Sequence, residues 1–416
     1  MKIGILSQWF DPEPGPASLP GVYAREFIAS GHDVSVLTGF PNYPTGRIYD
    51  GYRLSRRRRE FRDGAAVTRV ALYPSHSASA LGRISNYASF AVSATASGGS
   101  ALRGADAVWV YNSPVTVGLP LFWHTRAGRT PFFLHVQDLW PDSLIESGMV
   151  PRGQFGKLAS VAVDRLVRLT ERQAAIVGVS SRGMREVILE RHPRIDPSKL
   201  IYAPNPTNEE LFRSAALVRG ELGLRVEGTE KVELMYAGAI GEVQGLDTLL
   251  DAAAMLSEHS HIQFSIVGDG ISRERLERRV ASEDLHNVRF LGRVPQTAIP
   301  ELIARAQIQI VSLAAAPFLA YTTPSKISAL LASGVPIIGQ LSGDGARLIR
   351  DSSAGTAITP GDASGLCAAI VEMVDGGPAL WAKLGAAGRA YYETNLSARA
   401  TAAAILRSLF PIEGTS

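Results

Sequence analysis

Apolar and polar residues occur along the chain in short blocks that predict strands and helices in alternation. Apolar runs such as residues 3–6 and 34–37 are typical of buried strands, and a segment with helical character separates them. The same rhythm restarts after a proline-containing join at residues 201–206. Strands that alternate with helices form parallel sheets. The pattern therefore predicts an α/β protein with two successive Rossmann-like domains that face each other across a cleft.

The domain boundaries follow from the restart of this rhythm. We predict an N-terminal domain at residues 1–204, a C-terminal domain at 205–390, and a final helix at 391–416 that crosses back to the N-terminal domain. Residues 208–221 are predicted as a polar connector. The strands expected in the two domains are 2–6, 34–37, 66–72, 107–111, 131–136 and 173–180, followed by 232–236, 262–267, 288–291, 308–313 and 335–338.

Composition agrees with a globular protein of more than one domain. The chain has 416 residues, of which 46% are hydrophobic and 19% charged. Its single cysteine, Cys367, excludes an intramolecular disulfide and a cysteine-based metal cluster. No secretory signal and no run of 18 apolar residues is seen, so we expect a cytoplasmic protein that is soluble or peripheral to the membrane.

The basic residues are unevenly placed, with six arginines between Arg53 and Arg62. Such a cluster fits peripheral contact with anionic lipid headgroups, at roughly 1 kcal/mol per charge. A solvated strand face next to a loop is the alternative interpretation. No nucleic-acid partner is expected, because neither an aromatic-rich sheet nor a recognition helix accompanies the cluster.

Residues 321–336 are predicted to form a helix with both ends marked. Thr323 is the expected N-cap, Pro324 fits the first turn, and Gly334 fits the left-handed position after the last turn. The helix follows an apolar strand, so its first turn lies where open parallel sheets bind ligands. Ser325 and Lys326 would there bind an anion through amides, a hydroxyl and an ammonium. An ordinary capped helix with a solvated lysine is the alternative.

Glycine-rich turns follow several predicted strands of the C-terminal domain. Alone each is a common tight turn, but together with Ser325 and Lys326 they line one sheet edge, where backbone amides approach a diphosphate closely. No Asp-x-Asp motif is present, so we expect no metal and no cofactor, with Lys326 and Arg347 neutralising the phosphates. The nicotinamide fingerprint and the P-loop are also absent. The predicted donor-binding residues in these turns are Gly238, Gly241, Gln244, Gly268, Gly270, Gly343, Asp344 and Gly345.

In the N-terminal domain, His135 and Asp138 fall at the carboxyl end of the predicted strand 131–136. An imidazole and a carboxylate at that position are placed for chemistry. A buried histidine and a helix-capping aspartate are the alternative interpretation.

A series of short motifs gives the chain a family resemblance. It resembles the family 4 retaining glycosyltransferases of the GT-B fold, specifically their WbuB-like branch. The resemblance covers nearly the whole chain, and it is the set of motifs that is specific. The motifs, in order, are Gly-His-Asp-Val (31–34), Pro-Asn-Tyr-Pro (41–44), Gln-Asp-Leu-Trp-Pro-Asp (137–142), Gln-Gly-Leu-Asp (244–247), Val-Gly-Asp-Gly (267–270), Pro-Ser-Lys (324–326) and Ser-Gly-Asp-Gly-Ala (342–346).

The resemblance implies a nucleotide-sugar donor, usually a UDP-sugar, bound mainly by the C-terminal domain. The acceptor, a saccharide, a lipid-linked saccharide or a small natural product, would lie against the N-terminal domain, and the sugar would be transferred with retention. Residue by residue, it implies catalytic positions at His135 and Asp138 and phosphate contacts at Ser325, Lys326 and Gly15. It also implies acceptor contacts at Asn42, Tyr43 and Trp140.

The chain departs from the wider family at several of these positions. Ala239 and Gln244 replace an arginine and a lysine, and Tyr321 and Ala329 stand where a Glu-x7-Glu pair is usual. The ribose-binding carboxylate is therefore missing, and Asp344 and Glu242 are the candidates to replace it. Two other functions stay open: a non-catalytic nucleotide-sugar-binding subunit, and a nucleotide-sugar epimerase or hydrolase on the same fold.

Overall fold

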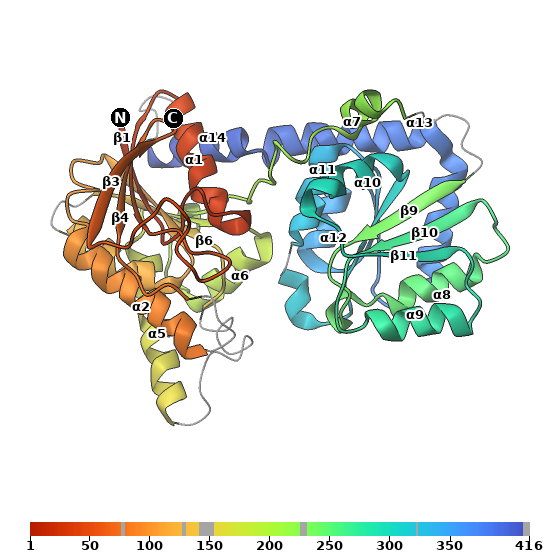
Figure 1. Cartoon of the computed structure of the whole chain (residues 1–416), viewed down its shortest axis with the longest axis horizontal. Coiled ribbons are helices and arrows are strands. Elements are labelled where there is room, and N and C mark those ends of the chain that lie inside the picture. Colours follow the sequence, from red (N-terminus) through yellow and green to blue (C-terminus); the bar gives the residue numbers. More distant parts are fainter. Residues whose placement is uncertain (76–79, 127–129, 141–153, 225–230, 322, 411–416) are drawn as a thin grey trace. The chain divides into compact units, whose positions relative to one another are not determined.

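Two α/β units make up the chain. The computed structural model describes residues 1–75, 80–126, 130–140, 154–224, 231–321 and 323–410. The N-terminal unit comprises Met1–Ser180, Met184–Pro204 and the residues from Thr401 onward. The C-terminal unit comprises Ser181–Gly183 and Asn205–Ala400 (Figure 1).

The N-terminal unit is built on one sheet with the strand order β3-β4-β2-β1-β5-β6-β7-β8. All neighbouring strands in it pair in parallel except the edge strand β3, which runs antiparallel to β4. Its strands are β1 (Lys2–Leu6), β2 (Asp33–Gly39), β3 (Arg57–Arg62), β4 (Ala65–Val70), β5 (Ala107–Asn112), β6 (Phe132–Val136), β7 (Ile176–Val179) and β8 (Leu200–Tyr202).

Alternate residues of these strands enter two cores, because successive side chains of a strand point to opposite faces. Val108, Val110 and Leu134 pack on one face with residues of the α2, α3 and α6 helices. Trp109 and Phe133 pack on the other face with α1 and with the last helix, α14. The helices of this unit are α1 (Leu19–Ala29), α2 (Ala80–Ser97), α3 (Gly118–Arg126), α5 (Gln154–Gln173), α6 (Arg182–Arg191) and, from Thr401, α14 (Ala398–Leu409).

The C-terminal unit is built on a parallel sheet with the order β11-β10-β9-β12-β13-β14. From β9 the chain adds β10 and β11 in turn toward one edge of the sheet. It then returns to place β12 on the other side of β9 and adds β13 and β14 toward the opposite edge. The strand order therefore reverses between β9 and β12. The strands are β9 (Val232–Ala237), β10 (Ile262–Val267), β11 (Val288–Gly292), β12 (Ile308–Ser312), β13 (Ile337–Gln340) and β14 (Gly355–Ile358).

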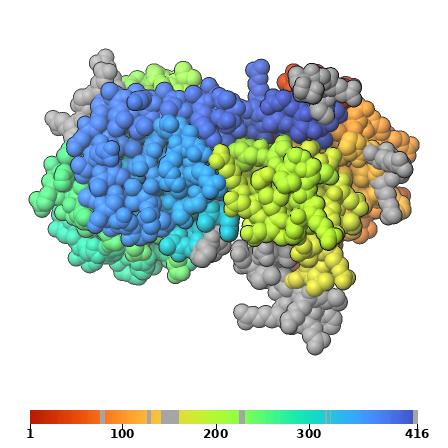
Figure 2. All heavy atoms as spheres, turned by 180° about the vertical axis from the view of Figure 1, so that it is seen from behind, coloured from red at the N-terminus to blue at the C-terminus, as the bar shows by residue number. Residues whose placement is uncertain are grey.

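Helices α8, α9 and α13 share a core with one face of this sheet. Helix α13 bends where Gly377 takes a positive φ of 62° just before Pro378; its outer side forms much of the blue surface in Figure 2. The helices of this unit are α7 (Ala215–Leu222), α8 (Asp247–Met255), α9 (Arg273–Ser282), α10 (Ile299–Arg305), α11 (Ser325–Ser333), α12 (Gly343–Asp351) and α13 (Ala363–Asn395).

The predicted fold class, two α/β units with parallel sheets, is confirmed. The alternation of apolar runs identified most strands, but short and exposed ones were missed. Strands β8 and β14 were not predicted, and four of the six clustered arginines lie on the exposed edge strand β3. The polar connector at 208–221 was wrong in part, because α7 occupies its second half. Ala215 and Val218 are buried there, and Gly223 ends the helix in the left-handed conformation.

None of the helices in the described parts of the chain is both long and apolar enough to cross a lipid bilayer.

Candidate active site

The candidate donor site of the C-terminal unit lies where the strand order reverses, at the carboxyl ends of β9 and β12. Open α/β sheets bind ligands at such a point, because neighbouring loops diverge there and leave a crevice. The β9 strand runs into Gly238, and β12 leads through a short segment into α11, whose second residue is Lys326. A Cβ atom added to Gly238 would lie 2.5 Å from the Lys326 Nζ. The structure thus brings the first glycine turn and the lysine into direct proximity.

The glycine turns after β9 and β10 pack backbone against backbone. Gly268 has a φ of 139°, and a Cβ atom there would overlap the carbonyl oxygen of Gly238. Likewise, Gly270 has a φ of 158°, and a Cβ atom there would overlap the carbonyl oxygen of Ile240. The Gly238 amide donates to Val267 at 2.9 Å, which fixes the first turn on the second strand. Glycine is required at these positions by close approach as well as by backbone angle.

Lys326 is a half-buried cation without a counter-charge among the described residues. Its Nζ lies over the Tyr236 ring, 4.2 Å from the ring centre, and makes no hydrogen bond or ion pair with any described residue. Burial lowers its pKa to about 8. The Tyr236 hydroxyl donates to the Ala239 carbonyl at 2.6 Å, so the ring is held in place by the glycine turn itself. An anion beside the ammonium would supply the missing charge.

The start of α11 differs from the prediction by one residue. Pro324, with φ −58° and ψ 126°, is the N-cap, and Ser325 is the first helical residue. Thr323 is therefore not the N-cap, because the proline ring and its extended ψ place the helix start after it. Ser325 is exposed and Lys326 follows it. Gly334 ends the helix with φ 67° in the left-handed region, as predicted.

The other predicted donor residues are distributed around this edge. A Cβ atom on Gly343 would overlap the carbonyl oxygen of Ala320, and one on Gly345 would lie 3.2 Å from the Pro324 ring, so α12 begins beside the start of α11. Asp344 is 7% exposed in the first turn of α12. The Gln244 side chain accepts a hydrogen bond from the Gly241 amide at 3.0 Å, which occupies it in holding its own turn.

In the N-terminal unit, Asp138 follows the end of β6 and is half-buried. Its carboxylate accepts a hydrogen bond of 3.1 Å from the Ser113 hydroxyl, which follows β5. Burial raises the Asp138 pKa, and the bond to Ser113 opposes that shift. Burial and, more weakly, the Asp138 carboxylate also raise the pKa of Tyr111. Strand order reverses between β1 and β5 in this sheet, so Asp138 lies close to the ligand-binding edge here as well.

A group of aromatic rings lies beside Asp138, and of these only Tyr43 was predicted from the sequence, as an acceptor contact. Trp9, three residues after the end of β1, has its ring centre 5.9 Å from that of Tyr43, 6.4 Å from that of Tyr87 and 6.5 Å from that of Tyr111. Trp9, Tyr43 and Tyr87 are all half-buried. Trp9 lies in the long loop at 8–16, where no periodicity marks it, and only the topology brings it to Tyr43 and Tyr87.

Glu13 was also missed, although it links the two loops at this edge. Its Oε1 accepts hydrogen bonds from the Asn42 and Tyr43 amides, each at 2.8 Å, and its Oε2 accepts one from the Phe10 amide at 3.1 Å. The side chain is 1% exposed, and burial raises its pKa to about 7 against the opposing effect of the three amides. The carboxylate thereby fixes the backbone that carries Tyr43.

Glu13→Ala would leave these three buried amides without an acceptor. An unsatisfied buried donor costs about 1–3 kcal/mol, so we expect the free energy of unfolding of the N-terminal unit to fall by at least that much. Urea unfolding measures the loss of stability, and hydrogen exchange of the amides between Phe10 and Tyr43 shows whether the two loops open. Glu210→Ala, at an exposed position of the C-terminal unit, is the control. Unchanged protection of the Asn42 and Tyr43 amides would show that Glu13 does not hold the loops.

His135 is located inside the core of the N-terminal unit, which differs from its predicted position beside the substrate. It is 0% exposed, and its ring packs against Tyr23, Trp109 and Phe133. Strand alternation explains this, because His135 and Phe133 point to the same face of β6, the one covered by α1. The Nε2 atom donates to the Ala203 carbonyl at 2.8 Å. The geometry matches a buried structural histidine, and Asp138 is left as the candidate at this strand end.

The buried imidazole should make folding stability depend on pH. Burial lowers the His135 pKa from 6.5 to about 4. Between these two pH values only the unfolded chain takes up a proton on this histidine. The contribution of His135 to the free energy of unfolding is therefore full above pH 6.5 and is lost as the pH falls to about 4. That contribution is about 3 kcal/mol. Urea unfolding at pH 7 and pH 4.5 should show a larger loss in the parent than in His135→Asn, and equal losses would contradict the assignment.

The predicted acceptor residues have mixed placements. Asn42 is 2% exposed and bonds to the Phe40 carbonyl and Asn86, so it supports the loop from within. Trp140 is 5% exposed and packs with Val115 and Val167, and its role as an acceptor contact stays a prediction.

Gly15 is exposed, with φ 64°, in the N-terminal unit, whereas the other predicted phosphate contacts are in the C-terminal unit. Pro141 and Asp142 of the motif at 137–142 lie outside the described residues.

Family models match both units of the chain. The description "Glycosyl transferase 4-like domain" matches residues 17–206, and "Glycosyl transferases group 1" matches residues 231–375. The chain belongs to the family 4 glycosyltransferases. It therefore transfers a sugar from a nucleotide-sugar donor. The resemblance to the WbuB-like branch within this family stays a prediction.

Two relatives agree with this family assignment. A protein of Escherichia coli (strain K12) named as the colanic acid biosynthesis glycosyl transferase WcaI is 29% identical over 349 residues, covering 80% of this chain and 82% of that protein. A protein of Pseudomonas aeruginosa named as the glycosyltransferase WbjE is 22% identical over 58% of this chain and 59% of its own.

Solved structures show the same fold, GT-B, as predicted. Anabaena HepE, in complex with UDP and glucose, is 16% identical with a TM-score of 0.62, covering 99% of this chain and 100% of that one. The lipopolysaccharide glycosyltransferase WaaG is 15% identical with a TM-score of 0.58, covering 99% and 100%. Among the described residues of this glycosyltransferase, no three His, Cys, Asp or Glu side chains gather as a metal site.

Proposed function

We propose that this glycosyltransferase uses a UDP-sugar, transfers the sugar with retention at the anomeric carbon, and needs no metal ion. The observation that carries the proposal is the unpaired Lys326 ammonium beside Gly238, at the point where the sheet order of the C-terminal unit reverses. A diphosphate there would receive amides from the first turn of α11 and one full positive charge. HepE, a protein of the same fold, is known in complex with UDP.

In this proposal, Lys326 stabilises the negative charge that develops on the departing diphosphate. Preorganised charge at a leaving group lowers the barrier because no solvent has to reorganise during the step. The bond between the anomeric carbon and the diphosphate oxygen would break, and the acceptor oxygen would bond to that carbon on the same face of the sugar. The departing diphosphate oxygen would take the proton of the acceptor hydroxyl. The protein then has to hold donor and acceptor in position.

The acceptor side of the proposal rests on Asp138 and the aromatic group around Trp9. Flat rings of this kind pack against the apolar faces of sugars, and the Asp138 carboxylate accepts a hydrogen bond from a hydroxyl, as it does from Ser113. We propose a saccharide, a lipid-linked saccharide or a small natural product as the acceptor, and a cytoplasmic location for the reaction. Asp344 is proposed to take the place of the ribose-binding carboxylate.

Thermal shift and calorimetry with UDP, GDP, ADP and dTDP, each with and without EDTA, test the donor side. We expect selective stabilisation by UDP that EDTA does not change. A response that requires a divalent cation would overturn metal independence, and a preference for another base would overturn the assignment of UDP.

The non-catalytic alternative and the epimerase alternative make different predictions. Slow release of free sugar from UDP-sugar without an acceptor would count against a non-catalytic subunit. Conversion of the donor to its epimer would instead favour the epimerase. The stereochemistry of transfer is read from the anomeric proton coupling of the product, and inversion would overturn the proposed retention.

A further inference from the structure

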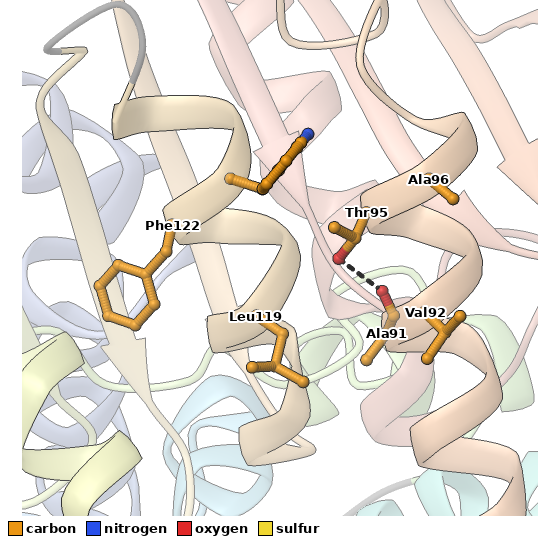
Figure 3. A pocket seen from close by; sticks show the side chains of 7 residues that line it. Ala91, Val92, Thr95, Ala96, Leu119 and Phe122 are labelled. Atoms are coloured by element: carbon orange, nitrogen blue, oxygen red, sulfur yellow. Dashed lines mark hydrogen bonds between the residues drawn. The ribbon is translucent and has the colours of Figure 1, made fainter.

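An apolar groove lies between helices α2 and α3 on the N-terminal unit (Figure 3). Its volume is about 850 Å³. Val92 and Thr95 of α2 line one side, and Leu119, Phe122 and Trp123 of α3 line the other. His124 bonds to the Ala94 carbonyl at 2.9 Å, so a side-chain hydrogen bond joins the two helices.

The walls of the groove are exposed large apolar side chains. Val92 is 66% exposed, Leu119 49% and Trp123 68%. The one hydroxyl in the lining, that of Thr95, donates back to the Ala91 carbonyl of its own helix at 2.8 Å. A ligand in the groove therefore meets hydrocarbon and an indole ring, and a contiguous apolar surface of this kind is typical of an interaction site.

Arg57 and Arg59 of the edge strand β3, and Arg56 just before it, bond to hydroxyls at or shortly after the carboxyl end of the same α2 helix. Arg56 bonds to the Ser97 hydroxyl at 3.2 Å, and Arg57 and Arg59 bond to the Ser100 hydroxyl at 3.4 and 2.8 Å. Ser97 is the last residue of α2, and Thr95 of the groove lies two positions before it. The positive charges are thus held next to the apolar groove.

These three arginines have no carboxylate partner among the described residues, whereas Arg58 of β3 pairs with Glu60 at 3.3 Å. Phe61 lies on the same face of β3 as Arg57 and Arg59 and is 77% exposed. A solvated strand face would account for the exposed arginines but not for the exposed Val92 and Trp123 of the groove, nor for the exposed Phe61 of β3.

We propose that this face docks on an anionic lipid bilayer, with a lipid chain in the α2–α3 groove and lipid phosphates on Arg56, Arg57 and Arg59. Peripheral membrane proteins use this arrangement of side chains. A tryptophan lies at the boundary between lipid headgroups and acyl chains, apolar side chains lie deeper, and arginines lie at the level of the phosphates. The charge of the arginines is complementary to phosphate, and the groove to hydrocarbon. This docking surface goes beyond the proposed reaction, and its test uses no sugar substrate.

Sedimentation of the full chain with vesicles tests the proposal. We expect binding to vesicles of neutral and anionic phospholipid mixed, much weaker binding to purely neutral vesicles, and loss of binding at high salt as the charges are screened. Arg57→Glu/Arg59→Glu should lower the partition coefficient at least tenfold, and Trp123→Ser about fivefold or more. Both variants should keep the parent's melting behaviour, because the three side chains are exposed.

Matched controls lie in the C-terminal unit. Arg278→Glu/Arg293→Glu makes the same change in net charge at exposed arginines, and Leu217→Ser removes a leucine that is 62% exposed. Neither control should change vesicle binding. Equal loss in the control pair and in Arg57→Glu/Arg59→Glu would mean a diffuse effect of net charge and would overturn the docking surface.

Fluorescence quenching tests the groove itself. Lipids brominated on their acyl chains should quench tryptophan emission of the bound parent, and Trp123→Phe should lose most of that quenching while still sedimenting. Unchanged quenching in Trp123→Phe would overturn insertion at the groove. Binding to single-stranded nucleic acid or an acidic polypeptide without binding to vesicles would overturn the lipid assignment altogether.

Discussion

Replacing Lys326 by methionine should weaken UDP binding by roughly 2–4 kcal/mol, which is about 30- to 1000-fold in affinity. The ammonium has no counter-charge in the described structure, so a bound diphosphate would gain its full charge-assisted interaction. Methionine has a similar length and no charge, so it fills the space over the Tyr236 ring. Calorimetry with UDP measures the difference, and an unchanged affinity would remove Lys326 from the donor site.

The lowered pKa of Lys326 gives this prediction a second readout. Because the free protein's ammonium has a pKa of about 8, raising the pH from 7 to 9 deprotonates most of it before UDP binds. We therefore expect about tenfold weaker binding at pH 9. Lys326→Arg is the control, because its guanidinium keeps its charge over this pH range. Any change in UDP affinity with pH in this variant therefore comes from the nucleotide itself. If UDP affinity depended on pH in the same way in the parent and in Lys326→Arg, the proposed role of the ammonium would be contradicted.

Gly268→Ala should destabilise the C-terminal unit by about 3–5 kcal/mol. The added methyl group would overlap the Gly238 carbonyl oxygen, and the φ of 139° is one that alanine rarely adopts. Relief of the overlap requires the turns after β9 and β10 to separate, which disturbs the surroundings of Lys326 as well. Urea unfolding with hydrogen exchange of the β9 and β10 amides measures the loss, and UDP binding should fall with it.

Gly361→Ala separates the cost of backbone strain from the cost of the steric overlap. Gly361 also has a positive φ, 83°, but no atom lies within 4 Å of an added Cβ. It should cost only the backbone strain, about 1–2 kcal/mol. If Gly268→Ala costs no more than Gly361→Ala, the close approach of the two turns is not a determinant of the site.

The sequence predicted the elements that carry strong local signals. Residues 262–267 were placed as a strand and are β10, because a short, mainly apolar run that ends at a glycine turn is typical of a buried strand. Gly334 was predicted in the left-handed position and is found there. Short strands such as β8, with three residues, lack enough length for a period to be recognised, and their pairing in the sheet stabilises them instead.

By itself, the sequence determined that two parallel α/β sheets form, that glycine turns follow their strands, and that Lys326 starts a helix after one of them. These are local properties, set by apolar runs, turn residues and helix ends. Which residues meet at each site was decided only by the tertiary structure. The direction of a side chain at a strand end depends on which face of the sheet a helix covers, and for that reason His135 lies in the core. Trp9 and Glu13 share one loop, but Tyr43 and Tyr87 are distant from that loop in the sequence, and only the tertiary packing at the reversal of strand order brings these side chains together.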